Sequence, residues 1–340
     1  MRREIPKYED EKCDTYELAK AISPAIYLYS IGFEAFEWQR IVASSKSNRV
    51  ILLCSRQAGK STIVSSIPCH TAKYVDKSLN LVIAPTEDQA KEDILKIKDF
   101  IAHDPTYPDL KRDGSDIIQL DNGSRIIVVV ATDKACRGYS KPNTVVLDEA
   151  SRIPDVIYKS GVVPMMNNNK KGRVFMLSTP FGRAGFFYDT WTRQTNTWTK
   201  MFVRTPYDVD PSNSLRLIDA EPEREFKERC AAQGIIGLYS PNHADRAGQQ
   251  EILEEIGETQ YQQEFCCDFV EINGQVFRDA DLKRYFENRG TPWNSPATRF
   301  IPDEQRLAVG AEGITSSAAP TATASGATAL TPKKLGGKYF

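Results

Sequence analysis

The chain has 340 residues, of which 41% are hydrophobic and 26% are charged, and its formal net charge is −1. This composition is typical of a globular protein with a sizeable core, and the length allows one large domain or two ordinary ones. A near-neutral balance excludes a chain that is basic throughout, so any nucleic-acid surface must be local, and no apolar run approaches the ~18–20 residues that span a bilayer.

Seven cysteines are scattered along the chain, and no two of them form a C-x-x-C pair. Only three histidines could complete a metal site, so we expect no zinc site and interpret most thiols as small buried hydrophobes. Free thiols and an N-terminus without the apolar core of a signal peptide indicate a reducing cytoplasm.

The chain begins with residues 1–30, which we predict to be a helical extension interrupted at Pro24. Next comes FEAFEWQR, in which Gln39 follows an aromatic residue shortly before an apolar strand. A Gln amide offers one donor and one acceptor group, which can read the edge of adenine. The alternative is an ordinary amphipathic helix with Trp38 in the core.

The sequence RVILLCSRQAGKST, Arg49–Thr62, is the centre of the prediction. Residues 50–54 read as a strand buried on both faces, and a tight loop leads into a helix that begins with Gly-Lys-Ser. This is the arrangement of a phosphate-binding loop, in which backbone N–H groups and the helix dipole favour anions. The residues expected around the phosphates are Ser55, Arg56, Gln57, Ala58, Gly59, Lys60, Ser61 and Thr62.

This loop departs from the usual pattern at Cys54, where a Gly is expected. A chance Gly-Lys-Ser at a helix start is therefore an open alternative. Arg56 can reach phosphate oxygens with two N–H groups, as Lys cannot, or it can simply face solvent.

Further elements alternate along the chain: a helix over 63–75, a strand over 79–84, and a helix over 87–102 capped by Thr86 or Glu87. A loop over 104–113 precedes a hairpin over 116–130 with an Asn-Gly turn. This order predicts an α/β fold, a P-loop NTPase with a largely parallel central sheet flanked by helices.

An acidic pair, Asp148-Glu149, follows the short apolar strand at 144–147. Ligands bind at the carboxyl ends of strands in open α/β sheets. Asp148 would join Ser61 in the Mg²⁺ shell, and Glu149 would orient and polarise an attacking water. Alternatively, the pair is a plain strand cap or surface charge.

Two other groups are candidates for sensing the terminal phosphate. Ser178-Thr179 directly follows the strand over 173–177, and a hydroxyl there could contact phosphate. Alternatively, the two residues simply form the turn that ends the strand. Arg137 stands beside a Gly in an expected loop, as an arginine finger does, although a surface Arg is the ordinary reading.

From 199 onward the pattern is more helical, with helices expected over 221–233 and 251–265 and a hairpin or linker over 269–277. Residues 315–329 are almost entirely Ser, Thr, Ala, Gly and Pro, so we predict a disordered tail. We therefore divide the chain into an N-terminal helical extension over 1–30, a P-loop ATPase core over 31–198, a helical lid or linker subdomain over 199–285, and a linker and tail over 286–340.

Taken together, these motifs resemble the ATPase domain of the large terminase subunit of tailed bacteriophages and prophages. The order and spacing agree over roughly residues 30–280, and loops of the form S-R-Q-x-G-K-[ST] in that family account for Cys54. The motifs are WQR at 38–40, SRQAGKST at 55–62, LDNGSRI at 120–126, CRG at 136–138, VVLDEA at 145–150, LSTPFG at 177–182, FFYDTW at 186–191 and YQQEFCCDF at 261–269.

The resemblance implies a set of roles. ATP and Mg²⁺ would be the cofactors, and the partners would be double-stranded viral DNA, a portal protein, a small terminase subunit and further copies in a ring, in the host bacterial cytoplasm and without a membrane. Lys60 and Ser61 would bind the phosphates and Mg²⁺, with Asp148 as a further carboxylate beside the metal, and Glu149 would be the catalytic carboxylate. Gln39 would contact adenine, and Arg56 would sense phosphate within the same subunit (in cis). Arg137 would act in trans on a neighbouring subunit, and Ser178–Pro180 would couple hydrolysis to DNA movement.

Family members continue into a ribonuclease-H-like nuclease, and here 307–313 resembles the start of its first strand, with Glu312 where an Asp is expected. The residues that follow are too few for a nuclease fold, so we expect no DNA cleavage by this chain alone. Two competing hypotheses are a helicase-like nucleic-acid-dependent ATPase and an inactive nucleotide-binding prophage remnant.

Overall fold

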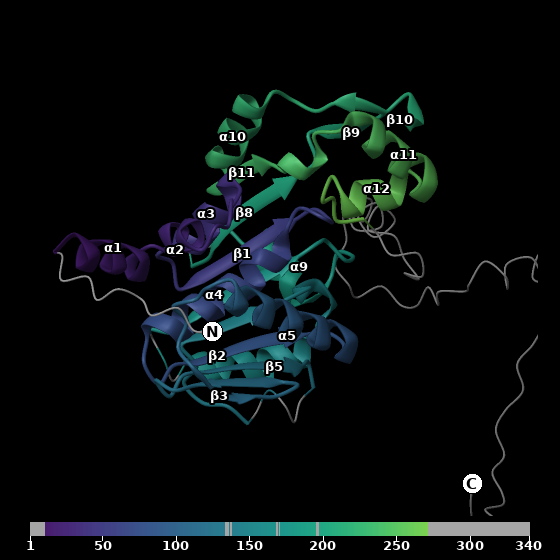
Figure 1. Ribbon diagram of the computed structural model, residues 1–340. Coiled ribbons are helices and arrows are strands. Elements are labelled where there is room, and N and C mark those ends of the chain that lie inside the picture. Colours follow the sequence, from purple (N-terminus) through teal and green to yellow (C-terminus); the bar gives the residue numbers. More distant parts are fainter. Residues whose placement is uncertain are drawn as a thin grey trace, which may run out of the picture. The chain divides into compact units, whose positions relative to one another are not determined.

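The computed structural model describes residues 11–132, 136, 138–167, 169, 171–194 and 197–270, all within the first of the two units, residues 1–278, into which the chain divides. No helix in these ranges is both long and apolar enough to cross a membrane. The helices are α1 Glu11–Ile22, α2 Pro24–Ser30, α3 Glu37–Ser44, α4 Lys60–Tyr74, α5 Glu87–Ala102, α7 Asp155–Ile157, α8 Val163–Asn167, α9 Gly185–Thr192, α10 Glu223–Ala232, α11 Arg246–Ile256 and α12 Glu258–Glu264, with single turns at Ala150–Arg152, Tyr158–Val162 and Pro241–His243 (Figure 1).

Nine strands form the main sheet, in the order β11-β8-β1-β7-β6-β2-β5-β4-β3. Every neighbouring pair from β11 to β5 is parallel, and β4 and β3 complete an antiparallel edge. The strands are β1 Arg49–Cys54, β2 Leu79–Ala84, β3 Leu110–Asp113, β4 Ile117–Leu120, β5 Arg125–Val130, β6 Thr144–Leu147, β7 Arg173–Ser178, β8 Thr199–Arg204, β9 Tyr207–Asp210, β10 Asn213–Asp219 and β11 Ile235–Tyr239.

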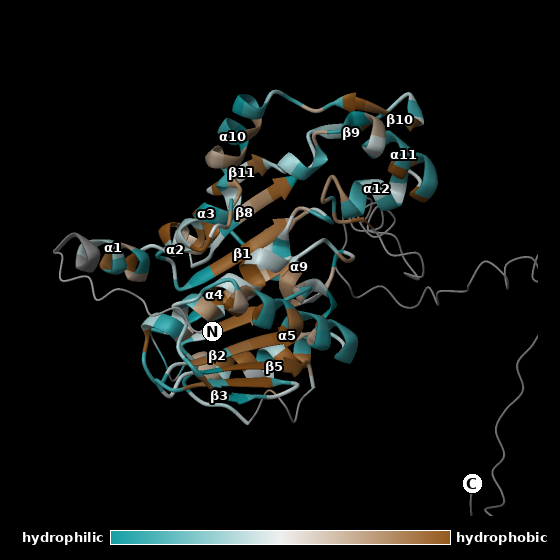
Figure 2. Ribbon diagram, in the orientation of Figure 1, coloured by the Kyte–Doolittle hydropathy of each residue, from teal (hydrophilic) through white to brown (hydrophobic). Residues whose placement is uncertain are grey.

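Helices cover both faces of this sheet, which is why its central strands are mostly apolar (Figure 2). On one face, Leu52 of β1 belongs to a core with α2, α3, α4 and α5. On the other face, Leu53 belongs to a core with α8 and α9. This arrangement confirms the predicted α/β class with a largely parallel sheet between helices.

The carboxyl ends of β1, β7 and β6 lie next to one another. Leu53 is level with Ser178, and Leu147 is level with Met176. The loop after β1, the acidic pair after β6 and the polar end of β7 therefore meet at one edge of the sheet, as the sequence predicted.

Most local predictions are confirmed. Helix α5 spans the predicted 87–102, and the Thr86 side chain accepts a hydrogen bond from the Gln89 N–H at its first turn. Helices α1 and α2 are separated at Ser23, directly before Pro24, and β4 and β5 form the predicted hairpin. The loop predicted over 104–113 is wrong at its end, where β3 pairs with β4.

The predicted helical character of the region from 199 onward is also wrong in part. Strands β8 and β11 extend the main sheet, so the sheet crosses the predicted boundary at 198, and β9 pairs with β10 in a separate hairpin. Strands β8, β9 and β10 mix polar and apolar residues over short lengths, and β11 is an apolar run of only five residues, and periodicity does not separate either pattern from a helix. The helix predicted over 251–265 is broken at Gly257, whose φ is 78°. The predicted linker and tail over 286–340, and nearly all of the segment 269–277, lie outside the described residues.

A buried ionic cluster fastens the N-terminal helices to the core. The carboxylate of Asp104 lies 2.6 Å from Lys73 Nζ and accepts a hydrogen bond of 2.9 Å from the Tyr27 hydroxyl. Burial alone would raise the pKa of Asp104, but Lys73 and Thr106 outweigh burial and hold the pKa below its ordinary value. The cluster therefore joins α2, α4 and the loop after α5 by charge as well as by packing.

Replacing Asp104 by Ala should destabilise the protein by roughly 3–5 kcal/mol, because it leaves the nearly buried Lys73 ammonium without its counter-charge. The matched control is Asp88→Ala, which removes an exposed pair with Lys91 and should cost about 1 kcal/mol or less. Urea unfolding of both variants measures the difference. Equal losses in the free energy of unfolding would contradict the assignment.

Candidate active site

The predicted phosphate loop lies between β1 and α4. Strand β1 ends at Cys54, which is fully buried, and α4 begins at Lys60. Burial raises the pKa of the Cys54 thiol to about 12, so the thiol is neutral. Cys54 is level with Val203 of β8, so the position where the usual pattern has Gly belongs here to a strand and tolerates a side chain. The turn itself depends on Gln57 and Gly59, whose φ angles are 59° and 98°.

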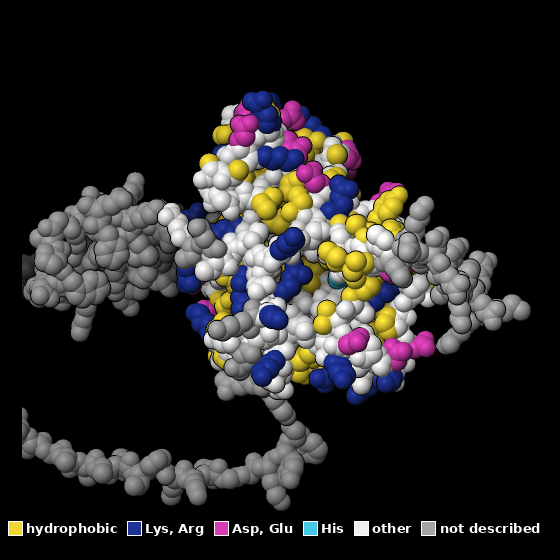
Figure 3. Space-filling view, turned by 90° about the vertical axis from the view of Figure 1, so that its left-hand side faces the viewer, with side chains coloured by type: hydrophobic (Ala, Val, Ile, Leu, Met, Phe, Trp, Pro, Cys, Tyr) yellow, Lys and Arg dark blue, Asp and Glu magenta, His cyan; other side chains and the backbone are white. Residues whose placement is uncertain are grey.

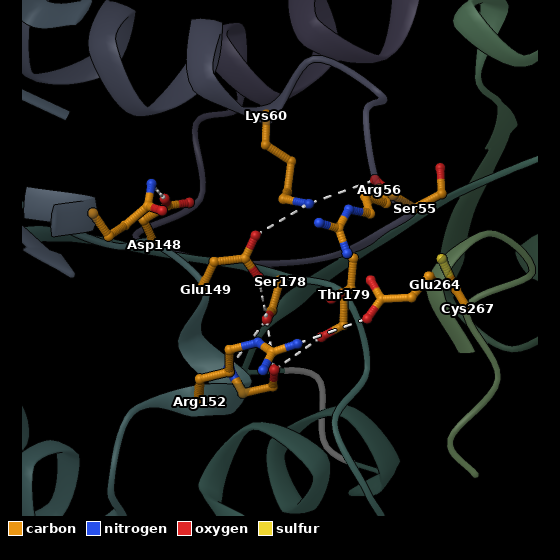
Figure 4. Close-up of polar contacts among 12 residues, drawn as sticks. Ser55, Arg56, Lys60, Asp148, Glu149, Arg152, Ser178, Thr179, Glu264 and Cys267 are labelled. Carbon is orange, nitrogen blue, oxygen red and sulfur yellow. Dashed lines mark hydrogen bonds and ion pairs between the residues drawn. The ribbon is translucent and has the colours of Figure 1, made fainter. Parts of the chain in front are cut away.

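Lys60 reaches back from α4 across the loop. Its Nζ lies 3.5 Å from the Ser55 carbonyl oxygen and 3.5 Å from Glu149 Oε1 (Figure 4). Burial alone would lower the pKa of Lys60, but Glu149 and other nearby acidic groups outweigh burial and raise it. The ammonium group is therefore charged and is held over the carboxyl edge of the sheet.

Glu149 is turned into the site by an unusual backbone conformation. Its φ of 45° is left-handed, a conformation that costs energy for a residue other than Gly and is concentrated at functional positions. The second carboxylate oxygen accepts a 3.2 Å hydrogen bond from the Ser178 hydroxyl. Ser151 joins the Ser178 hydroxyl to the Thr179 carbonyl oxygen through contacts of 2.7 and 2.9 Å. The acidic pair and the end of β7 thus form one hydrogen-bonded unit.

Asp148 is fixed from α5 by Gln89, which also contacts Asp93, and the sequence analysis found neither residue. Gln89 Nε2 donates to Asp148 Oδ2 and to Asp93 Oδ1, both at 3.1 Å. Asp148 is 5% exposed, and burial together with Glu149 raises its pKa to about 6. Asp93 is 1% exposed, and burial together with Asp148 raises its pKa to about 8. The only sequence signal was a Gln and an Asp one turn apart on the helix that follows β2.

Gln39 lies against the loop from α3. Its Oε1 accepts a 2.8 Å hydrogen bond from the Phe36 N–H, and its Nε2 donates a 2.9 Å hydrogen bond to the Gly59 carbonyl oxygen. Both polar groups of this buried amide are therefore engaged within the protein. Gln39 connects the start of α3 to the last residue before α4.

The other side of the loop is held by residues from far along the chain. His243 Nε2 lies 2.9 Å from the Arg56 carbonyl oxygen, and Asn242 Nδ2 donates to the Gln57 carbonyl oxygen at 2.9 Å. The Arg56 N–H donates to the Glu264 carbonyl oxygen at 2.7 Å. Burial lowers the pKa of His243 to about 4, so the ring is neutral and acts as a fixed hydrogen-bonding group.

The remaining predicted residues are placed as follows. The Arg56 side chain is exposed at the rim of the loop, Ala58 is buried, and Ser61 and Thr62 occupy the first turn of α4, with Ser61 exposed. The predicted site residue Arg137 lies outside the described residues. The structure brings together Lys60, Asp148, Glu149, Ser178 and Thr179 at the edge of the sheet.

Comparison with known proteins gives two findings. The family model described as "Terminase large subunit, T4likevirus-type, N-terminal" matches residues 51–284. Among solved structures, a variant of the large terminase ATPase domain of Thermus phage P74-26 aligns with a TM-score of 0.54 at 17% identity, over 72% of this chain and 98% of that one. The large terminase of bacteriophage HK97 aligns with a TM-score of 0.50 at 14% identity, over 68% of this chain and 50% of that one.

These structural likenesses show a shared fold, and the chain aligns with about half of the HK97 protein. No curated protein sequence matched the chain.

Replacing Gly59 by Ala should destabilise the protein more than an ordinary left-handed Gly would. The added Cβ would lie 2.9 Å from Gln39 Nε2, in addition to the backbone cost of about 1–2 kcal/mol at positive φ. Gly234→Ala is the matched control, since its φ is 70° and no atom lies within 4 Å of the added Cβ.

Urea unfolding should therefore give the larger loss for Gly59→Ala, and adding Gln39→Ala should recover part of it. If both glycine variants lose the same free energy of unfolding, the close approach of Gln39 to the loop is wrong.

Proposed function

Because the chain belongs to the large terminase subunit family, as the ATPase part of a phage DNA-packaging motor, we propose how its residues divide the work of hydrolysis. One observation carries the proposal. The Lys at the start of α4 and the Glu after β6 face each other at 3.5 Å across the carboxyl edge of a parallel sheet. A cation for phosphate and a carboxylate for water at this edge suit nucleotide hydrolysis.

We propose that the loop 55–62 binds the phosphates of ATP. Its N–H groups and the start of α4 favour anions, and Lys60 supplies the positive charge. Lys60 is paired with Glu149 in the structure, so phosphate would replace the carboxylate as its partner. Since Asn242, His243 and Glu264 bond to the loop backbone, the loop is held in its turn before the nucleotide arrives.

We propose that Asp148 and Ser61 hold Mg²⁺ together with the nucleotide. Carboxylate and hydroxyl oxygens are ligands that suit this ion, which usually keeps several waters and takes only one or two protein carboxylates. The donor set fits, since Asp148 supplies a carboxylate oriented by Gln89 and Ser61 supplies an exposed hydroxyl in the first turn of α4. When bound, Mg²⁺ neutralises phosphate charge. Gln89 would act as a positioning residue that keeps the Asp148 carboxylate oriented.

We propose that Glu149 is the catalytic carboxylate that orients the attacking water and accepts its proton. Loss of the Lys60 contact on nucleotide binding would free one carboxylate oxygen, while Ser178 still contacts the other. A shift of the Glu149 carboxylate would be transmitted to the end of β7 through the hydrogen bonds of Ser178 and Ser151. This connection supports the proposed coupling role of Ser178–Pro180.

The roles of the other predicted residues remain proposals. Gln39 would contact adenine through the second N–H of Nε2 or the second lone pair of Oε1, while its hydrogen bonds to Phe36 and Gly59 hold the amide in place. Arg56, exposed at the loop rim, would sense phosphate in cis, and Arg137 would act in trans on a neighbouring subunit. We further propose double-stranded viral DNA, a portal protein and a small terminase subunit as partners, and a ring of copies docked on the portal in the host cytoplasm.

Glu149→Gln tests the proposed function. The variant should bind ATP about as tightly as the wild type but hydrolyse it at least ~10²-fold more slowly, because the amide cannot accept the proton from water. Fluorescent-nucleotide binding and steady-state phosphate release, with duplex DNA and portal added, measure the two effects. The control is Glu254→Gln on the exposed face of α11. Unchanged hydrolysis by Glu149→Gln, or a wild type that binds ATP without turnover, would refute the proposal.

Gln89→Leu tests the support of Asp148. It removes the donor to both carboxylates and should lower kcat roughly 10–100-fold while raising the Mg²⁺ concentration needed for half-maximal rate. Gln260→Leu, at an exposed position on α12, is the matched control. A lower rate with an unchanged Mg²⁺ requirement would argue against a positioning role for Gln89.

A further inference from the structure

The amino ends of the parallel strands form an edge whose charge differs from that of the rest of the chain. The segments that lead into β1, β6, β7 and β8, at 44–49, 138–143, 167–173 and 193–200, contain no Asp or Glu, although 45 of the 340 residues are acidic. These four strands are neighbours in the order β8-β1-β7-β6, so their amino ends meet at one edge. The described Lys and Arg residues there are Lys46, Arg49, Lys141, Lys171, Arg173, Arg193 and Lys200. We call this the basic edge.

Carboxylates do not neutralise this charge. In the described part of the chain, none of the seven basic side chains forms an ion pair. Where hydrogen-bond partners occur they are backbone carbonyl oxygens: Arg49 donates to Asn48 and Gly172, Arg173 to Ser45, and Lys200 to Arg193. Exposed cations elsewhere often have a carboxylate within 4 Å, as in the pairs Lys91–Asp88, Lys159–Asp155 and Arg224–Glu228.

The basic edge is also hollowed. A hollow of about 510 Å³ is lined by Lys46, Lys171 and Arg173, and a smaller one of about 140 Å³ by Arg49 and Trp198. A third, of about 550 Å³, is lined by Trp191, Trp198 and Lys200. Figure 3 views the molecule from this side and shows Lys and Arg side chains down the middle of the face, with few acidic ones among them.

We propose that the basic edge binds the phosphate backbone of duplex DNA, an inference that rests on the proposed motor function. Lys and Arg accompanied by Ser, Thr and Asn are the side chains that contact phosphates, and such contacts carry no sequence information. Three spacings between four neighbouring strands span about 14 Å, close to the ~12 Å width of the major groove, so phosphates on both sides of a groove are within reach.

An acidic protein is the competing partner, and the surface favours DNA. Protein interfaces have an apolar centre. None of the exposed large hydrophobic side chains of the described residues lies in the four segments, and the two that line the 510 Å³ hollow, Ile22 and Val75, come from the ends of α1 and α4. The basic edge lies at the opposite end of the strands from Lys60 and Glu149, so the two sites can be occupied together. A contact with backbone alone suits a motor that must move along any sequence.

The test replaces three exposed basic-edge residues at once, with Lys46→Gln, Lys141→Asn and Lys171→Gln. Asn is chosen at position 141 because its φ is 54°, a conformation that Asn tolerates. Affinity for a random-sequence, fluorescein-labelled duplex is measured over a range of salt concentrations. If each Lys contacts a phosphate, the magnitude of the negative slope of log K against log salt should decrease by about 2.7, and affinity should fall on every sequence.

The control replaces three exposed cations elsewhere, with Lys91→Gln, Lys159→Gln and Arg224→Gln, and should leave the salt slope unchanged. DNA-independent ATP hydrolysis should be unchanged in both triple variants, which also verifies that they fold. A single Arg193→Gln should reduce the magnitude of the slope by about 0.9.

Equal duplex affinity and slope in the basic-edge variant and the wild type would overturn the inference. A wild type that hydrolyses ATP but does not bind duplex would also overturn the inference. The inference would fail as well if the basic-edge variant loses binding to polyaspartate but keeps its binding to duplex. A wild type that binds duplex through the basic edge but hydrolyses no ATP would leave the inference standing and refute the proposed function.

Discussion

Parallel pairing of β1 with β7 and of β7 with β6 is the constraint on which the site depends. Strands buried on both faces must satisfy their backbone groups within the sheet, so their register is fixed. That register places the ends of three strands side by side and brings together Lys60, Glu149 and Ser178, which are far apart in sequence. The same pairing gathers the strand beginnings at the other edge, where the chain has collected basic residues.

The carboxyl edge is supported from several directions. Gln39 contacts the loop from α3, Gln89 fixes Asp148 from α5, and His243 contacts the loop from beyond β11. These supporting groups are buried or half-buried and are hydrogen-bonded to backbone or carboxylate oxygens. A phosphate site built this way needs little rearrangement of its backbone when it binds an anion, and the Lys60 side chain is the part that must exchange partners.

Much of this arrangement could be predicted because it is encoded locally. Apolar runs followed by Gly-Lys-Ser or Asp-Glu identify β1, β6 and the polar groups after them, and helix α5 is recognisable from its period and its Thr86 cap. The supporting residues could not be predicted, because Gln89 and His243 acquire their meaning only from contacts across the fold. Strands β8 and β11 were missed for a related reason: β8 is short and of mixed polarity, β11 is a five-residue apolar run with a central Gly, and both are defined by their neighbours in the sheet rather than by their own sequence.

The hydrogen bond from the Arg56 N–H to the Glu264 carbonyl oxygen has a consequence for how the protein is made. During synthesis the loop emerges from the ribosome long before residue 264, and a contact of such sequence separation forms late in folding. A nascent chain therefore carries an incompletely supported loop until α12 has been translated and packed. The loop therefore gains its full set of backbone contacts only after residue 264 has been synthesised.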